Sequence, residues 1–148
     1  MNDKLIINLE KEDPFEIINK GELIEINPET NKYRKCQNKL SPYVIGVCID
    51  EPKDISNIIP YEINKENYSV NEAKKLTKTE TVNVQIAGIV TVKTNGIVCI
   101  GDLLVSNENG NVEAVRYKQD WNNLGRIIGK CIQMTENEDE CIMLMINM

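Results

Sequence analysis

The chain has 148 residues, of which 41% are hydrophobic, and a formal net charge of −6. This length allows one ordinary domain with a real core, or two small lobes that share one. The acidic balance, without clustered Lys or Arg, argues against a nucleic-acid surface, and no stretch approaches the roughly 20 apolar residues that span a membrane. Because no secretion signal opens the chain either, we expect synthesis in the cytoplasm.

The residue types exclude several kinds of chemistry. Histidine is absent, so Ser-His-Asp and Cys-His nucleophiles, His-ligated zinc and imidazole proton transfer are all excluded. The five cysteines include no C-x-x-C pair, and Cys48 and Cys131 lie in apolar strand patterns, so we interpret the cysteines as buried thiols rather than metal ligands. We therefore predict no catalytic residue, no cofactor, no metal site and no enzymatic activity.

The N-terminal segment, residues 1–16, is interpreted in two ways. It is either the first strand of the core or an extended arm that adds a strand to the sheet edge of a partner. The candidate partner-binding residues of such an arm are Leu5, Ile6, Ile7, Leu9 and Phe15. If it is an arm, deletion of residues 1–13 should leave the remaining domain folded.

From residue 17 onward the chain repeats itself. The segments IINKGELIEINPETNKYRK and YVIGVCID correspond to IVCIGDLLVSNENGNVEAVRY and RIIGKCIQ, which predicts an internal pseudo-repeat of residues 17–50 and 97–133. In each copy a glycine, Gly21 or Gly101, is expected where one strand turns sharply into the next. The acid that follows, Glu22 or Asp102, is expected to accept hydrogen bonds from the amides of the turn.

A second pair of glycines lies inside strand patterns. Gly46 and Gly129 precede V-C-I and K-C-I at matching places of the repeat, which predicts a bulge or a close backbone approach at a corner. Valine at Gly129 should therefore destabilise the fold.

The segment between the copies differs from the rest. Residues 52–80 lose the strand alternation, and Ser69-x-x-Glu72 has the form of a capping box that opens a short helix. We interpret this segment as a crossover between two lobes, with a partner-binding insertion as the alternative.

Turn signals follow in the second half. Asn95-Gly96 and Asn109-Gly110 each stand between β-branched runs, which predicts two-residue hairpin turns with a glycine at positive φ. The final run, residues 141–146, is apolar at every position and is expected in the middle of a sheet or sandwich.

Together these patterns predict an all-β protein. Nine to eleven short strands with regular turns indicate a barrel-like or sandwich-like fold with one short helix or irregular insertion. We expect residues 17–148 to form a single β domain made of two pseudo-equivalent lobes.

The repeated motifs also resemble a known family. G-[DE]-L-[LI], V-I-G-V and the run from Val90 to Asp102 are similar to the small all-β module of virion proteins from phages and prophages of Gram-positive bacteria. That module is known as the C-terminal, self-cleaving intramolecular chaperone of tail fibres, and related modules are head fibres or capsid decoration proteins. For this chain we expect no fibre shaft before the module, and no serine (Ser41, Ser56, Ser69, Ser106) stands beside a recognisable base.

The resemblance implies a role in the virion. The expected function is a capsid decoration protein that binds the outside of the head, with the major capsid protein or another virion protein as partner. The first alternative is a tail-fibre, baseplate or head-fibre module, and the second is a self-cleaving chaperone domain. We expect a homotrimer, as is common among such modules, with no nucleic-acid or membrane partner.

Overall fold

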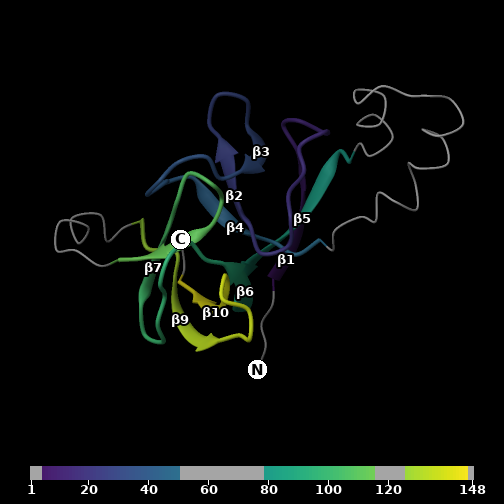
Figure 1. The fold of residues 1–148 in the computed structure, drawn as a ribbon. Helices are drawn as coiled ribbons and strands as arrows, with labels where there is room; N and C mark the ends of the chain where they lie inside the picture. The colour runs from purple at the N-terminus through teal and green to yellow at the C-terminus, as the bar shows by residue number, and fades with distance from the viewer. Residues whose placement is uncertain (1–4, 51–78, 116–125, 147–148) are drawn as a thin grey trace, which may run out of the picture.

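The computed structural model describes residues 5–50, 79–115 and 126–146, which form ten β-strands (Figure 1). The strands are β1 (Leu5–Glu10), β2 (Leu23–Asn27), β3 (Lys32–Lys35), β4 (Val44–Cys48), β5 (Thr81–Ala87), β6 (Ile89–Lys93), β7 (Leu103–Ser106), β8 (Val112–Ala114), β9 (Gly129–Met134) and β10 (Glu140–Met145). They make two antiparallel five-stranded sheets, so the predicted all-β, sandwich-like fold is confirmed. The predicted helix at Ser69 and nearly all of the 52–80 crossover lie outside the described residues. Within the described ranges, no helix is long and apolar enough to cross a membrane.

The two sheets have the same topology. Strands β1 to β5, here called lobe 1, are ordered β1-β5-β4-β2-β3, and strands β6 to β10, lobe 2, are ordered β6-β10-β9-β7-β8. The turn hydrogen bonds repeat as well: the Gly21 amide donates to the Cys48 carbonyl at 2.9 Å, and the Gly101 amide donates to the Cys131 carbonyl at 2.7 Å. The predicted internal repeat is therefore confirmed. It also extends to the pairs β1/β6 and β5/β10, beyond the predicted ranges.

Each sheet curls until its two edge strands meet. Lys11, directly after β1, forms an isolated parallel bridge with Tyr33 of β3, and Thr94, directly after β6, forms the matching bridge with Val112 of β8. One bridge instead of a continuous ladder joins the edges, so neither sheet is a closed barrel.

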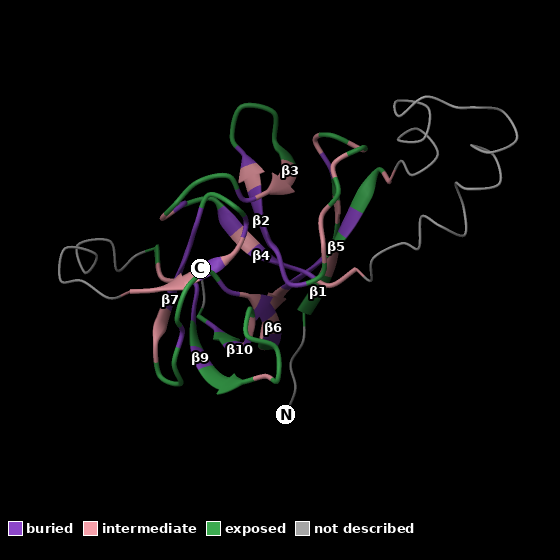
Figure 2. Cartoon of the chain, in the orientation of Figure 1, coloured by how far each residue is buried: buried purple, intermediate pink, exposed green. Residues whose placement is uncertain are grey.

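Each lobe has its own apolar interior, and the two interiors correspond position by position. The inner residues of lobe 1 are Ile7, Leu9, Ile18, Ile24, Tyr33, Ile45, Cys48, Val82, Val84 and Ile86. Their counterparts in lobe 2, in the same order, are Val90, Val92, Val98, Leu104, Val112, Ile128, Cys131, Cys141, Met143 and Met145. All of the lobe 2 residues are buried, whereas six of those in lobe 1 are only partly buried (Figure 2). Burial of its own interior therefore stabilises lobe 1 less than lobe 2.

Lobe 1 also buries the opposite face of its sheet, against lobe 2. Four residues of this face belong to the same apolar cluster as the interior of lobe 2: Leu23, Cys36, Val44 and Val47. Three backbone hydrogen bonds cross the contact: the Lys93 amide donates to the Gly21 carbonyl at 3.0 Å, the Leu23 amide donates to the Gly110 carbonyl at 2.8 Å, and the Leu40 amide donates to the Ser106 carbonyl at 3.0 Å. Strands β2 and β4 are thus covered on both faces.

One of the two predicted hairpins is wrong. Strand β6 ends at Lys93 and pairs with β10, while residues 97–102 form no strand and the Asn95 amide donates to the Val112 carbonyl at 2.8 Å. Gly96 still has a positive φ of 74°. Asn109-Gly110 does lie in a hairpin, between β7 and β8, but the loop comprises residues 107–111 instead of two residues.

The cysteines divide into four buried thiols and one exposed thiol, all of them free. The expectation of burial is wrong for Cys99, which lies in the turn before Gly101. Burial raises the pKa of the Cys36 and Cys48 thiols to about 11 and that of Cys141 to about 12. These three thiols are therefore neutral at pH 8 and poor nucleophiles.

We expect a thiol reagent such as DTNB at pH 8 to modify Cys99 quickly in the folded protein, and the other four cysteines only in denaturant. A Cys99→Ser variant should show no fast reaction, and DTT should leave the melting temperature unchanged because the structure holds no disulfide. Fast modification of two or more thiols in the native protein would contradict the burial.

Candidate binding surfaces

The two Gly-acid turns have corresponding hydrogen bonds. The Asn19 amide donates to Glu22 Oε1 at 2.6 Å, and the Cys99 amide donates to Asp102 Oδ2 at 2.7 Å. The glycines that precede these acids have φ values of +93° and +95°, which L-residues with a side chain rarely adopt. Each carboxylate closes its own turn, so the geometry assigns Glu22 and Asp102 a structural role.

Gly46 and Gly129 lie where their strands pack closely against the next strand. A Cβ built on Gly46 would stand less than 3.0 Å from backbone and side-chain atoms of β5, and one on Gly129 less than 3.0 Å from atoms of β10. This is a close backbone approach in both lobes, at corresponding positions of the repeat.

The candidate arm is the edge strand of lobe 1. β1 pairs with β5 along its whole length, and Ile7 and Leu9 pack inside the lobe, so the extended-arm interpretation is wrong for residues 5–10. Behind the strand, the Lys11 ammonium donates to the Glu16 carbonyl at 2.6 Å and to Thr79 Oγ1 at 2.8 Å. Burial lowers the pKa of this ammonium. The segment is therefore part of the fold.

The outer side of this region nevertheless carries exposed apolar side chains. Leu5 and Ile6 are about half exposed, and Phe15 is 37% exposed. Apart from the single bridge of Lys11 to Tyr33, the outer edge of β1 pairs with no described strand, and an unpaired edge can bind another chain.

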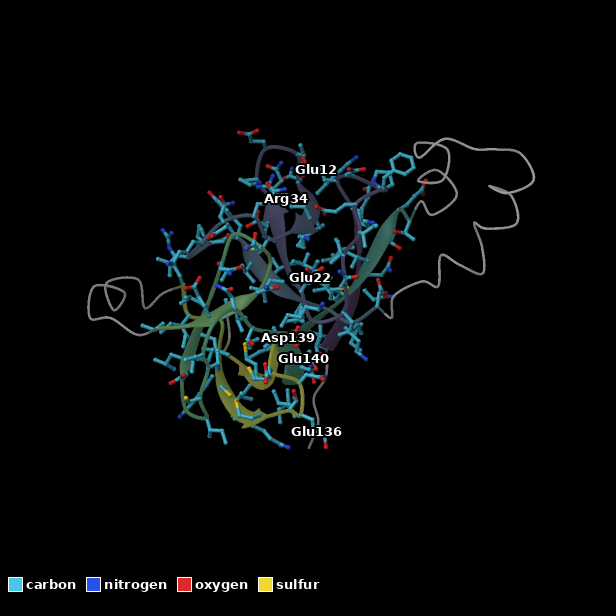
Figure 3. The ribbon with its side chains drawn as sticks, in the orientation of Figure 1. Glu12, Glu22, Arg34, Glu136, Asp139 and Glu140 are labelled. Atoms are coloured by element: carbon cyan, nitrogen blue, oxygen red, sulfur yellow. The ribbon has the colours of Figure 1, made fainter. Side chains whose placement is uncertain are left out.

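A buried polar network holds the loop that follows β3. The fully buried Glu25 accepts hydrogen bonds from Arg34 Nε at 2.9 Å, from Ser41 Oγ at 2.8 Å and from Asn38 Nδ2 at 3.3 Å. Arg34 also lies 3.8 Å from Glu12, and Figure 3 shows the two side chains on the same side of lobe 1. The carboxylate is thus paired and hydrogen-bonded, as a buried charge requires.

The same loop contacts lobe 2. The Leu40 amide donates to the Ser106 carbonyl at 3.0 Å, the Ser41 amide donates to Ser106 Oγ at 2.9 Å, and Arg126 donates to the Leu40 carbonyl at 2.8 Å. Both described serines therefore serve the lobe contact, whereas Ser56 and Ser69 lie outside the described residues. The sequence contained one signal for this network, since Glu25 and Arg34 have opposite charges and pair across the β2–β3 hairpin.

We expect Glu25→Gln to lower the free energy of unfolding by about 2 kcal/mol, because it removes the charge that Arg34 faces in a buried site while it preserves the shape. Glu29→Gln, in the exposed turn after β2, is the matched control and should change stability by less than about 0.5 kcal/mol. Equal urea midpoints for the two variants would exclude a structural role for the network.

The outer face of lobe 2 is exposed and partly apolar. On this face, three residues that lie opposite one another on β7, β9 and β10 form a row: Leu103, Lys130 and Leu144. The Leu144 side chain is 42% exposed. In lobe 1 the corresponding row is Leu23, Val47 and Gln85, and it is buried. The run 141–146 does lie mid-sheet, as β10 between β6 and β9, but on its outer face Ile142 is partly exposed and Leu144 is exposed.

Comparison with known proteins gives matches at the level of structure. No family model and no curated protein matches the chain. The head fibre gp8.5 N base of bacteriophage phi29 matches with a TM-score of 0.52 at 9% identity, over 97% of this chain and 94% of that chain. The chain shares the fold of this phage protein. The pre-mature gene product 12 of phi29 also matches, with a TM-score of 0.56 at 12% identity over 100% of this chain, which spans 22% of gene product 12.

These two matches bear on the resemblance drawn from the sequence. At such identities they show the fold alone, and both are structures of phage proteins. The finer resemblance to a self-cleaving fibre domain stays a prediction.

Proposed function

We propose that the protein is a structural protein of a phage virion and that it binds the outside of the head as a capsid decoration protein. The observation that carries this proposal is the likeness to the phi29 head-fibre base, because it covers almost the full length of both chains. The partner of the proposed contact is the major capsid protein.

The described surface suits a role in binding. The carboxylates of Glu22, Glu25 and Asp102 are engaged in turns or in the buried network, and the described part of the chain holds no group of three or more acidic or cysteine side chains that fits a metal ion. A decoration protein stabilises its shell by binding, so its effect scales with occupancy. Exposed apolar side chains such as Phe15, Tyr43 and Ile100 offer surface on which such binding can occur.

The test uses particles of the phage or prophage that encodes the chain, with and without its gene. Cryo-EM should show added density on the outer head surface of the complete particles, and heads without the protein should break at lower temperature. Adding the purified protein back should restore both properties. Heads of equal stability that carry no added density would overturn the proposal.

A second candidate function is the base of a head fibre, which the likeness to the gp8.5 N base favours. In that case particles without the protein should have heads of normal stability but should adsorb more weakly to host cells. Density at the tail or baseplate would instead favour a tail-fibre or baseplate module. Cleavage of the purified chain, visible in its intact mass, would favour the self-cleaving domain.

A further inference from the structure

The contact between the two lobes uses different surfaces on each side. Lobe 1 contributes the Gly21 turn, the outer row of Leu23, Val47 and Gln85 and the loop after β3, while lobe 2 contributes strand β6 and the β7–β8 hairpin. Because the lobes are equivalent, each also has the surface that the other uses. Lobe 1 has β1 and the β2–β3 hairpin, and lobe 2 has the Gly101 turn and the row of Leu103, Lys130 and Leu144.

The Gly101 turn and the row of Leu103, Lys130 and Leu144 are here called the receiving surface of lobe 2. This surface is exposed, whereas its counterpart in lobe 1 is covered by lobe 2. A Cβ built on Gly21 would lie 3.3 Å from the backbone nitrogen of Lys93, whereas none of the described atoms lies within 4 Å of one built on Gly101. Leu23 is completely buried, and its counterpart Leu103 is partly exposed. Leu144 is 42% exposed and its counterpart Gln85 is 3% exposed.

Strand β1 and the β2–β3 hairpin are here called the docking surface of lobe 1. This surface is also more exposed than its counterpart in lobe 2. From Ile7 to Glu10 every residue of β1 is more exposed than its counterpart in β6. The hairpin turns differ likewise: Gly110 is buried against Lys35 and Cys36, while Asn31, which has the equivalent positive φ, is exposed.

The charges on the two unused surfaces are complementary. The counterpart of Lys93 in β6 is the exposed Glu10 in β1. The counterpart of Val47 in the covered row is Lys130 in the exposed row. The docking strand thus carries an acid, which lies 3.4 Å from Lys32 of its own hairpin, and the receiving face carries a base; opposite charges favour association, whereas two like charges would oppose it.

We propose that β1 and the β2–β3 hairpin of one copy dock on the Gly101 turn and the Leu103–Lys130–Leu144 row of a second copy, repeating between chains the contact that joins the lobes within a chain. The Glu10 amide then donates to the Gly101 carbonyl of the next copy, as the Lys93 amide does to Gly21. Such a contact is heterologous, and successive copies close into a ring or extend as a filament. The homotrimer expected from the sequence is one such ring.

The test measures the mass of the purified full chain by light scattering and sedimentation, from micromolar to millimolar concentration. The wild type should form assemblies of several copies, and Leu144→Asp should weaken association at least about 100-fold because the contact would have to desolvate a carboxylate in place of an apolar side chain. Ile97→Asp is the matched control: Ile97 is 80% exposed, and its counterpart Ile17 stays 62% exposed beside the covered turn. A single-chain mass for the wild type, or equal association of the two variants, would overturn the proposal.

A second pair of variants tests the docking strand. The Lys11 amide donates to the Glu80 carbonyl inside the sheet. Successive backbone amides of a strand point to opposite edges, so the Glu10 amide points to the open edge of β1. Glu10→Pro removes this outward donor and should weaken association, while Glu10→Ala retains it and should associate about ten times more tightly than Glu10→Pro. Equal association of two folded variants would exclude β1 from the contact. No capsid is present in these measurements, so their outcome is independent of the proposed decoration function.

Discussion

Gly46→Val and Gly129→Val should each lower the free energy of unfolding by about 4 kcal/mol or more, among the larger effects of single substitutions. At Gly46 the added Cβ would lie 2.6 Å from Val84 Cγ1 and would also meet the Gln85 carbonyl oxygen. At Gly129 it would lie 2.7 Å from the Leu144 carbonyl oxygen. Because these oxygens belong to the backbone of the neighbouring strand, the clash is relieved only by a shift of the strand.

Alanine at these positions already contains the clashing Cβ, so Gly46→Ala and Gly129→Ala should cost about 2–3 kcal/mol. Gly96→Ala is the control, since a Cβ there would meet no described atom within 4 Å; the cost of its positive φ is about 1–2 kcal/mol. Urea denaturation of the five variants measures these differences. If Gly46→Ala and Gly129→Ala unfold at the wild-type urea midpoint, the close strand approach is absent.

Local sequence signals predicted the repeated turns well. The Gly-acid pairs at Gly21 and Gly101 depend on positive φ and on a side chain that caps its own turn, and both effects act within a few residues. Strand pairing is different, because partners are chosen by tertiary packing. Asn95-Gly96 has the residues of a hairpin turn, but β6 pairs with β10 about fifty residues later, and no local pattern indicates that choice.

The surfaces were harder to predict than the interior. The apolar run 141–146 indicated burial on both faces, and the structure buries Cys141, Met143 and Met145 on the inner face but leaves Leu144 exposed. Lobe 1 has the equivalent face covered by lobe 2, so the difference arises from the arrangement of the lobes. A repeat found in sequence states that two units are alike, but it does not state which faces they use against each other.

The N-terminal strand was ambiguous for a related reason. Residues 5–10 alternate weakly, and their counterpart β6 shares no motif with them, so the repeat was recognised only from residue 17 onward. Their place became clear from the pairing of β1 with β5 and from the matching bridges at Lys11 and Thr94.

Deletion of residues 1–13 should therefore unfold lobe 1, contrary to the expectation for a free arm. The deletion removes all pairing between β1 and β5. It also takes Ile7 and Leu9 out of an interior that is only partly buried. Finally, it removes the Lys11 ammonium, which donates to the Glu16 carbonyl. Hydrogen exchange should show loss of protection along β5 and β4, with a fall in melting temperature.

The matched control replaces Leu5 and Ile6 by Ser, which removes exposed apolar side chains while the ladder and the buried Ile7 and Leu9 stay in place. This variant should retain the protection of β5 and most of the stability. Lobe 2 gives the internal reference, because its interior is fully buried and its ladders do not involve β1, so protection along β9 and β10 should survive longer than in lobe 1. If the truncated chain keeps its β5 protection and its melting temperature, β1 contributes little to the fold and the interpretation of residues 1–13 as a detachable arm is restored.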